Sequence, residues 1–407
     1  MEFLETFGIR PSYLDEPLGL IRPDLERANA GALPALLAPF LGETGAINRD
    51  VLKKIRNVTD SYENIVFIMA DGVGAEHLER IGGYLWENVQ THGTVAYSVF
   101  PTMTSTNLTS MAYGTLPACH GMVGYNIYSE RLNTLFNSLN GKYPKGKSSA
   151  SIFEHATVAD YIRGTPLPMQ IADQFTIKLL IPSQLPPEGL PDIIGQGTDR
   201  LSYTDLEEAL QKAVGVIRNG PVFLGIYLGM ADHLGHRHGP ESNEYVHAIH
   251  AINQFVKNLV ATLAGTSTLI LLTSDHGQSQ LDLKQCRFMN RAEWAEHKAR
   301  GVTLGTSGRV IHSYADDPDR SLRVLEQLAN GRGLILTGNE ALDLMGAKVC
   351  GDNFLKRVGS HVLMFEDGYI HDVPEVVELE HYDTPHKGQH GSLSTKEIFV
   401  PVGIWYA

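Results

Sequence analysis

The stretch NIVFIMADG, residues 64–72, decides the fold class of this chain, because a continuous apolar run ends there at an aspartate and a glycine. A run of this length without polar alternation is typical of a strand that is buried on both faces, as in a parallel sheet. Two further runs follow the same pattern: VFLGIYL at 222–228, which precedes Asp232, and TLILLT at 268–273, which precedes Asp275. The sequence therefore predicts that these three runs are central strands of one sheet.

Helical segments around these runs predict that the strands are parallel. Thr204 and Glu207 have the spacing of a capping box, and the apolar residues that follow lie on one helical face up to Ile217. A second amphipathic helix is predicted from about Ser242 to Leu263. Strand, helix and strand joined by short loops form the repeating unit of a parallel sheet. We therefore expect a doubly wound α/β fold with a mostly parallel sheet.

The remaining segments differ from this alternation. Residues 1–60 are punctuated by prolines and predict an N-terminal helical arm without chemistry of its own. Residues 280–385 mix short strand-like runs with a helix that begins at Asp317, which predicts a small inserted α+β cap. The α/β core would then comprise residues 61–279 and 386–407.

The composition excludes several classes of protein. The chain has 407 residues, of which 43% are hydrophobic and 19% charged, and its formal net charge is −13. Such a composition excludes a disordered tail protein, and no apolar run approaches the ~18 residues that a membrane-spanning helix needs. The negative charge argues against a nucleic-acid polymer or an anionic membrane as partner. A small phosphorylated substrate stays compatible with it, because bound metal ions reverse the field locally.

The cysteines and the N-terminus bear on the cellular compartment. Cys119, Cys286 and Cys350 are widely separated, which fits neither a disulfide framework nor a CxxC metal site. The N-terminal stretch MEFLETFGIR contains acidic residues and lacks the apolar segment of a secretory signal. We therefore expect a cytoplasmic protein.

Aspartates and histidines gather where the predicted strands end. In an open parallel sheet, ligands bind beyond the carboxyl ends of the strands. Asp71, Asp232 and Asp275 follow three such ends. His236 comes four residues after Asp232, so both can bind one metal ion if the chain turns between them, and His276 directly follows Asp275. A single aspartate in such a place is usually a helix cap, but the recurrence favours a metal site, and oxygen and nitrogen donors without cysteine suit zinc best.

A hydroxyl-rich segment, VFPTMTSTNLTSMAYGTLPACHG at 99–121, contains candidate nucleophiles. A hydroxyl bound to a metal ion loses its proton more readily and becomes a nucleophile at neutral pH. An asparagine in the same segment could donate a hydrogen bond to a phosphoryl oxygen. By pattern alone this evidence is weak, because most segments rich in serine and threonine serve as caps and turns.

Six short motifs run through most of the chain in one order. They are DG at 71–72, PTMTSTN at 101–107, GTLPACHG at 114–121, ADHLGH at 231–236, SDHG at 274–277 and QHG at 389–391. Together they resemble the alkaline phosphatase superfamily, and within it the nucleotide pyrophosphatase/phosphodiesterase branch; phosphonoacetate hydrolase is a relative with a similar layout. The resemblance implies an alkaline phosphatase-like core and a metal-dependent hydrolase that cleaves phosphodiester or pyrophosphate bonds in nucleotide-like substrates.

The resemblance also implies a role for each motif residue. Thr104 would be the nucleophile that forms a phospho-threonine intermediate, and Asn107 the catalytic amide that binds the phosphate. Two divalent ions would be bound, most simply zinc, with manganese or iron as alternatives. One ion would take Asp232, His236 and His390 as ligands. The other would take Asp71, Asp275, His276 and the Thr104 oxygen.

The chain departs from the family pattern in two places. Ser105 to Leu108 stand where members often have F-P-N-H, and Gly229 to Ala231 stand where two acidic residues often precede the D-x-x-G-H motif. These departures leave the leaving-group side of the site open. Phosphonate hydrolysis, phosphomonoester hydrolysis and a non-catalytic, metal-stabilised binding protein therefore remain alternatives. The cations available for a second acidic group are Lys145, Lys147 and Arg163.

Other histidines lie near the motifs, and the sequence leaves the role of several of them open. His120 is expected to be structural, in the turn after the nucleophile segment. His233 and His238 either orient the neighbouring ligands or face solvent. We favour His390 as a ligand because a glycine follows it as in the family; its rivals are His381 and His386.

Overall fold

The computed structural model of the protein describes residues 2–43, 45–59, 61–129, 132–141, 161–185, 189–350, 354–372 and 385–407. The three strands predicted from apolar runs form with their predicted bounds. They are β3 (Asn64–Ala70), β9 (Val222–Leu228) and β10 (Thr268–Thr273). β3 lies between the other two and pairs in parallel with both.

These strands are the centre of a seven-stranded sheet with the order β4-β19-β10-β3-β9-β7-β8. The outer strands are β4 (Thr94–Tyr97), β7 (Thr176–Pro182), β8 (Asp199–Tyr203) and β19 (Phe399–Tyr406). β19 runs antiparallel to both of its neighbours, and the pairs on the other side of β10 are all parallel. The predicted α/β fold with a mostly parallel sheet is confirmed.

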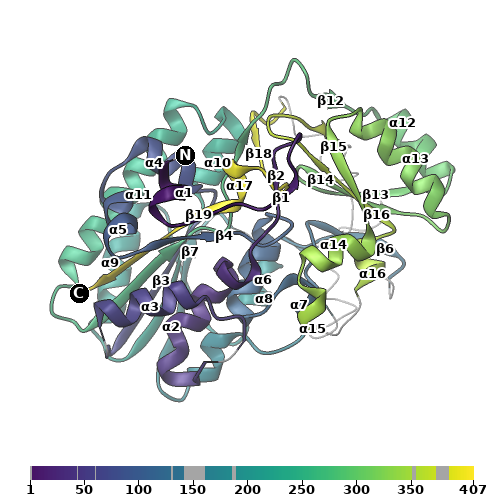
Figure 1. The fold of residues 1–407 in the computed structure, drawn as a ribbon. Coiled ribbons are helices and arrows are strands. Elements are labelled where there is room, and N and C mark those ends of the chain that lie inside the picture. The colour runs from purple at the N-terminus through teal and green to yellow at the C-terminus, as the bar shows by residue number, and fades with distance from the viewer. Residues whose placement is uncertain are drawn as a thin grey trace.

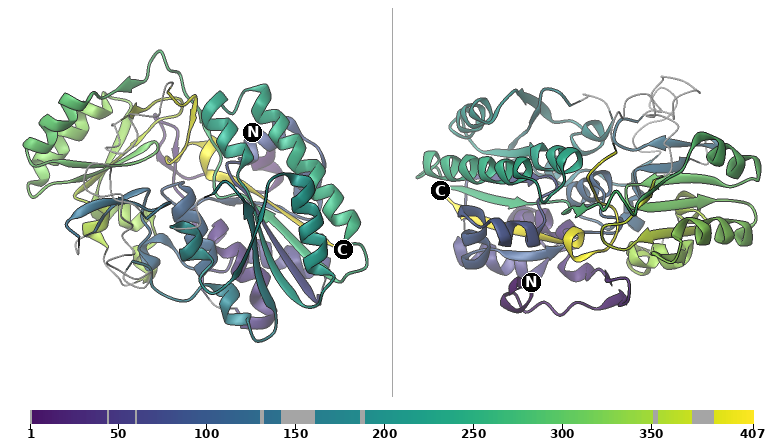
Figure 2. Two further views of the ribbon diagram at one scale, coloured as in Figure 1. Left: turned by 180° about the vertical axis from the view of Figure 1, so that it is seen from behind. Right: turned by 90° about the horizontal axis from the view of Figure 1, so that it is seen from above.

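Helices cover both faces of this sheet (Figures 1 and 2). Successive side chains of a strand point to opposite faces, and in β3 Val66 and Ile68 pack into one apolar cluster while Ile65 and Phe67 pack into another. Helices α4 (Ala75–Ile81), α5 (Tyr84–Thr91), α9 (Leu206–Ile217) and α11 (Asn243–Thr262) contribute to the first cluster. Helices α2 (Ala32–Leu41) and α3 (Arg49–Val58) contribute to the second. Residues predicted as an N-terminal arm thus supply part of one helical layer; the predicted domain boundaries stay predictions.

A second sheet lies beside the first, drawn in green in Figure 1. It consists of four antiparallel strands in the order β13-β14-β16-β15. Their bounds are β13 (Thr303–Ser307), β14 (Val310–Tyr314), β15 (Gly333–Thr337) and β16 (His361–Phe365). Helices α12 (Arg291–Ala299) and α13 (Pro318–Ala329) accompany it. We call residues 281–372, with this sheet, the cap.

Two helices show how well the N-terminal capping residue can be predicted from local sequence. Asp317 caps α13 as predicted, because its side chain accepts hydrogen bonds from the two residues that follow Pro318. The predicted Thr204 cap of α9 is wrong by one residue: Asp205 caps the helix through the Glu208 N–H, and Thr204 instead bonds the Glu208 carboxylate. Both residues can cap, so local sequence does not choose between them.

A buried ion pair joins the cap to the core, and two short ribbons lie where the chain enters and leaves the cap. β11 (Ser279–Gln280) pairs with β18 (Gly388–Gln389), and β12 (Arg287–Phe288) pairs in parallel with β17 (His371–Asp372). Arg309 donates to the Glu397 carboxylate, and both side chains are fully buried. Glu397 belongs to the short helix α17 (Thr395–Ile398).

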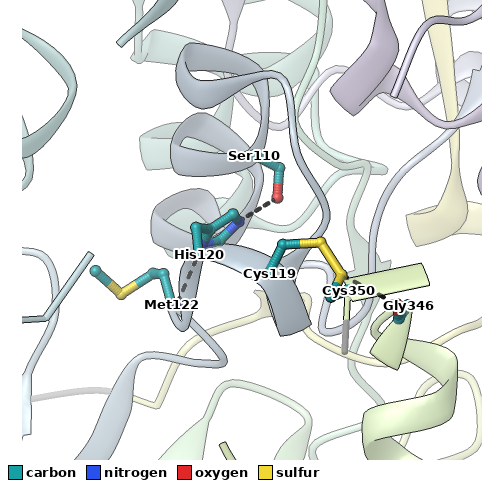
Figure 3. Close-up of a disulfide and its surroundings, with 6 residues drawn as sticks. All are labelled: Ser110, Cys119, His120, Met122, Gly346 and Cys350. Carbon is teal, nitrogen blue, oxygen red and sulfur yellow. Dashed lines mark hydrogen bonds between the residues drawn. A yellow bond between two sulfur atoms is a disulfide. The ribbon is translucent and has the colours of Figure 1, made fainter. Parts of the chain in front are cut away.

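A disulfide between Cys119 and Cys350 also links core and cap (Figure 3). Cys119 lies in α7 (Pro117–His120), near the end of the hydroxyl-rich segment at 99–121, and Cys350 ends α15 (Ala347–Cys350). The expectation that the cysteines form no disulfide is wrong for this pair, since residues 231 positions apart meet only in the folded chain; Cys286 is free. The cytoplasmic location stays a prediction, and the spacing of the cysteines no longer supports it.

Among the described residues, no helix is both long enough and apolar enough to cross a membrane.

Candidate metal centre and nucleophile

Three neighbouring strands deliver the predicted carboxylates to one edge of the sheet. Asp71 follows β3, Asp275 follows β10, and Asp232 lies just beyond β9. Gly72 allows these segments to approach each other: its φ is +73°, and a Cβ there would lie 2.8 Å from the Asp232 Cα. The DG motif therefore combines a ligand with a glycine that the fold requires.

Asp232 and His236 come from a helix, not from a turn. α10 (Met230–His238) begins directly after β9, and residues four apart lie on one face of a helix. The His236 Nε2 is 3.2 Å from an Asp232 carboxylate oxygen. The predicted pairing of these two residues is thus achieved, but by helical geometry.

Asp71, Asp275 and His276 form a cluster suited to one cation. Their ligand atoms all lie within 4.8 Å of one another, and all three residues are buried. In Asp275 one oxygen accepts from the N–H groups of Gly72 and His276, at 3.2 and 3.0 Å. Its other oxygen is buried without a hydrogen-bond partner, and so is one oxygen of Asp71. Buried carboxylate oxygens without donors fit metal ligands.

A second cluster adjoins the first. The ligand atoms of Asp232, His276 and His390 lie within 4.8 Å of one another, and the His390 Nε2 is 3.7 Å from the Asp232 carboxylate. The His236 and His390 rings are 5.1 Å apart. The structure thus brings together all three residues predicted for this ion and places His276 between both clusters.

The three imidazoles are oriented in the same way. Each Nδ1 lies against a backbone carbonyl: His236 at 2.9 Å from Gly388, His276 at 3.1 Å from Gly277, and His390 at 2.7 Å from Thr102. A carbonyl accepts only, so Nδ1 carries the proton in each ring and Nε2 offers its lone pair to the cluster. This second contact fixes the tautomer of metal-binding histidines.

The electrostatics of the clusters call for cations. Burial raises the pKa of Asp71 well above its usual value, and the nearby Asp275 and Asp232 raise it further. Burial, followed by His276, lowers the pKa of His390 well below its usual range. For Asp232, burial opposes ionisation, but the adjacent His236 lowers the pKa overall. Several carboxylates and neutral imidazoles buried together are stabilised when positive ions neutralise them, so the residues present fit two divalent ions.

Thr104 lies at the edge of the first cluster. It is the first residue of α6 (Thr104–Tyr113), and its hydroxyl is 3.2 Å from the His276 Nε2. It is half-buried, whereas Thr102, Ser105 and Thr106 are fully buried. Thr104 is thus the hydroxyl of this segment that a substrate can reach.

Asn107 has a different position from the one predicted. It is fully buried; its amide oxygen accepts from Ser98 and Val99, and its amide nitrogen donates to the Met103 carbonyl. Both ends of the amide hold the start of α6 in place, and the side chain does not reach the lining of the cavity described below. The predicted substrate contact therefore does not agree with the structure, and the physical reason is that every residue of α6 from Ser105 to Met111 is buried.

Two contributors were missed by sequence reasoning. The Tyr227 hydroxyl donates to the Asp71 carboxylate; this tyrosine lies within the apolar run of β9, where nothing marks it. Gln278 donates to the Asp232 carboxylate and carbonyl, at 2.5 and 3.1 Å. A Cβ at Gly235 would overlap the Gln278 side chain. Gln278 directly follows the SDHG motif, and this position in the sequence could have identified it as a residue of the site.

The remaining candidates are placed as follows. His120 is structural: its Nδ1 accepts from the Met122 N–H, its Nε2 donates to Ser110, and burial lowers its pKa to about 3 (Figure 3). His233 is exposed, and the His238 ring is 3.6 Å from Glu244. His386 packs 4.6 Å from the His236 ring. Arg163 stacks over Phe354. His381, Lys145 and Lys147 lie outside the described residues.

A cavity of about 420 Å³ borders these clusters. Thr104, Asp232, His236 and His390 line one part of it. The cap lines another part with Leu281, Phe288, Ile370 and Asp372, and Tyr125 and Leu139 complete the apolar lining. Cavities of this size suit a small organic ligand. The described lining residues include no lysine or arginine.

Comparison with known families agrees with this geometry. Residues 65–392 match the family described as type I phosphodiesterase / nucleotide pyrophosphatase. Venom phosphodiesterase 2 of Crotalus adamanteus is 25% identical over 242 residues, which are 55% of this chain and 28% of that protein. Ectonucleotide pyrophosphatase/phosphodiesterase family member 1 of Mus musculus is 25% identical over 237 residues, 54% of this chain and 24% of that protein. The matched segment spans about a quarter of these curated relatives.

Solved structures share the fold. An inactive variant of murine ectonucleotide pyrophosphatase/phosphodiesterase 5, in complex with AMP, has a TM-score of 0.60 at 16% identity and covers 84% of this chain and 87% of its own. Phosphonoacetate hydrolase from Sinorhizobium meliloti 1021, in complex with phosphonoformate, has a TM-score of 0.61 at 16% identity and covers 84% and 90%. At this identity the likeness concerns the fold alone.

Proposed function

Because the chain belongs to the type I phosphodiesterase / nucleotide pyrophosphatase family of the alkaline phosphatase superfamily, we propose that it hydrolyses phosphodiester or pyrophosphate bonds in small, nucleotide-like substrates with Thr104 as nucleophile. One observation carries the proposal. The Thr104 hydroxyl lies 3.2 Å from the His276 Nε2, beside a carboxylate cluster and in the lining of the cavity. A hydroxyl at a helix start beside such a cluster is placed for attack on a phosphate.

The residues would divide the work as follows. Asp71, Asp275, His276 and the Thr104 oxygen would hold one divalent ion, and Asp232, His236 and His390 the other. When bound, two zinc ions would acidify the threonine hydroxyl and neutralise the phosphate charge.

The chain itself would carry the covalent steps. The Thr104 oxygen attacks phosphorus and the bond from phosphorus to the leaving oxygen breaks. The leaving oxygen takes up the proton that the threonine hydroxyl loses and departs as an alcohol or a phosphate, and a phospho-threonine that still carries the other substituent forms. Backbone N–H groups in the first turn of α6 lack intrahelical acceptors and can donate to phosphoryl oxygens. Water then attacks phosphorus, the bond to the Thr104 oxygen breaks, and a phosphomonoester is released while the Thr104 oxygen takes up a proton from the attacking water.

The absence of lysine and arginine among the described cavity-lining residues favours a diester over its alternatives. A phosphomonoester carries a second negative charge on its phosphate, and a carboxylated phosphonate carries a further negative charge on its carboxylate. Arginine side chains usually bind such groups through two parallel hydrogen bonds. A diester carries one charge, which the ions would neutralise.

A substrate panel tests the proposal. Purified protein would be stripped with a chelator, reloaded with zinc or manganese, and assayed with bis(p-nitrophenyl) phosphate, p-nitrophenyl phosphate and phosphonoacetate. We expect kcat/KM to be highest for the diester and activity to vanish on chelation. Higher kcat/KM for the monoester or the phosphonate would replace the proposal with that alternative, and no turnover of any substrate would support a non-catalytic binding protein.

A further inference from the structure

We propose that the cavity selects phosphodiesters that carry a protonated amine, which Asp372 binds as a counter-ion beside the ring of Phe288. This inference rests on the proposed function for the phosphate end of the substrate and adds a site for the other end.

Asp372 and Phe288 stand side by side on two strands. They are direct partners in the parallel pairing of β12 with β17. Paired residues on adjacent strands project from the same face, and both residues line the cavity. Phe288 is 46% exposed, so its ring is accessible to a ligand. A carboxylate next to an accessible aromatic ring is a combination that binds organic cations, through charge and through the face of the ring.

The Asp372 carboxylate has no cationic partner in the described chain. No described residue forms a hydrogen bond or ion pair with its side chain, and its cavity neighbours Leu281 and Ile370 are apolar. Desolvation raises the pKa of Asp372 to about 6, so the group is mostly ionised at neutral pH. Asp372 is also exposed to solvent, so its carboxylate is open to a ligand, and a bound cation would supply the counter-charge that the described residues do not supply.

The charges of the lining narrow the ligand class. Of its 16 residues, Asp232 and Asp372 are acidic and none is lysine or arginine. Asp232 belongs to the proposed metal centre, which leaves Asp372 as the charge that faces the rest of the substrate. An anionic group there would be repelled, and a neutral group would leave the carboxylate uncompensated. A protonated amine satisfies both the charge and the hydrogen-bonding capacity of the carboxylate.

The test measures binding in a protein that cannot turn the ligand over. Thr104→Ala protein, loaded with zinc, would be titrated in a calorimeter with 2-aminoethyl methyl phosphate and with 2-hydroxyethyl methyl phosphate, which differ in the amine alone. We expect the amine to bind about tenfold more tightly. Adding Asp372→Asn should bring the two affinities together. Asp316→Asn, an exposed aspartate outside the cavity lining, should preserve the preference.

Equal affinities for the two ligands, or a preference that survives Asp372→Asn, would overturn the inference. A parallel assay of the wild-type protein with the p-nitrophenyl esters of aminoethyl and hydroxyethyl phosphate separates the two proposals. Hydrolysis of both esters at equal kcat/KM would leave the proposed function standing and reject the amine site. Binding preference without any hydrolysis would leave the amine site standing and reject the proposed function.

Discussion

At the scale of single residues, Thr104 offers the sharpest prediction. Thr104→Ala should lower kcat by about 10³-fold or more, because the covalent step loses its nucleophile, while metal content and thermal stability persist. Thr104→Ser should retain part of the activity, since the hydroxyl remains and only the methyl group that restricts its rotamer is lost. The measurement is kcat with an aryl phosphodiester, together with metal content.

Thr109→Val is the matched control for this series. Thr109 lies on the same helix, and its hydroxyl is buried without a partner, so an isosteric valine should leave kcat within a few-fold of wild type. Near wild-type turnover in Thr104→Ala would instead mean that water attacks the substrate directly. A phosphoryl group mapped by mass spectrometry to another hydroxyl would assign the nucleophile there.

Asp275 tests the metal centre through stability as well as metal content. Asp275→Asn keeps an oxygen that can accept from Gly72 and His276 but removes a buried negative charge. The variant should bind one divalent ion fewer by elemental analysis. In the presence of a chelator it should be more stable than the wild-type protein, because the repulsion that raises the pKa of Asp71 is relieved. Asp316→Asn should change neither quantity; a chelated Asp275→Asn protein that melts below the chelated wild type would contradict the assignment.

Single residues also mark the limit of sequence reasoning. Asp71, Asp232, Asp275 and His276 could be predicted as neighbours, because strand ends meet at one edge of a parallel sheet. Asn107 could not be placed, because a motif position does not tell which face of a helix becomes buried. Tyr227 could not be found at all, because its hydroxyl meets Asp71 across two strands that are 156 residues apart in the chain.

At the scale of elements, the Arg309–Glu397 pair holds the segment that carries His390. Glu397 also accepts from the N–H groups of Ser392 and Ser394, and the Arg309 N–H donates to the His390 carbonyl at 2.7 Å. The ion pair thus holds the segment around His390 in place through contacts from the cap and from α17.

Breaking this pair should be costly. Arg309→Met should lower the free energy of unfolding by about 3–5 kcal/mol, because the Glu397 carboxylate stays buried without its cation. The double variant Arg309→Met/Glu397→Gln should recover part of that loss, since no charge is left uncompensated. Denaturant midpoints measure both. Arg323→Met, on the exposed face of α13, is the control and should stay within about 0.5 kcal/mol of wild type; an equally small effect at Arg309 would reject the role of the pair.

Helices and strands differ in how well they can be predicted from the sequence. The central strands could be predicted with their bounds, because burial on both faces gives an uninterrupted apolar run. The short ribbons β11–β18 and β12–β17 could not, since two-residue strands carry no periodicity. α10 was not predicted as a helix, because its sequence MADHLGHRH has polar residues in place of an amphipathic pattern.

At the scale of the whole molecule, the disulfide between Cys119 and Cys350 connects the nucleophile side of the core to the cap. Replacing both cysteines by alanine should lower the free energy of unfolding by about 2–5 kcal/mol. The melting temperature of wild-type protein should fall in a reductant, and that of the double variant should not respond. Cys286→Ala, at the free cysteine, is the control. Peptide mapping that finds Cys119 and Cys350 as free thiols in the oxidised protein would contradict the pairing.

The cavity is a property of the whole molecule, which explains why its lining was not predicted. Its residues come from four distant parts of the chain: Met103 to Leu139, Asp232 and His236 in α10, Leu281 to Asp372, and Pro385 to His390. The sequence motifs identify the residues that follow the parallel strands, because the order of strands and helices already places these residues at one edge of the sheet. The cap wall depends on how two sheets dock, and only tertiary packing decides that.

The position of β19 has a consequence for the order in which the protein can assemble during synthesis. This strand, residues 399–406, inserts between β4 and β10, which end far earlier in the chain, at residues 97 and 273. While the ribosome is still adding residues before 399, β4 has no partner there and β10 exposes one edge. His390 also arrives late, so the metal centre cannot be complete until nearly the same moment. A nascent chain therefore carries this open sheet edge from residue 273 until residue 399 has been added, and protection of that edge by a chaperone would limit aggregation during this interval.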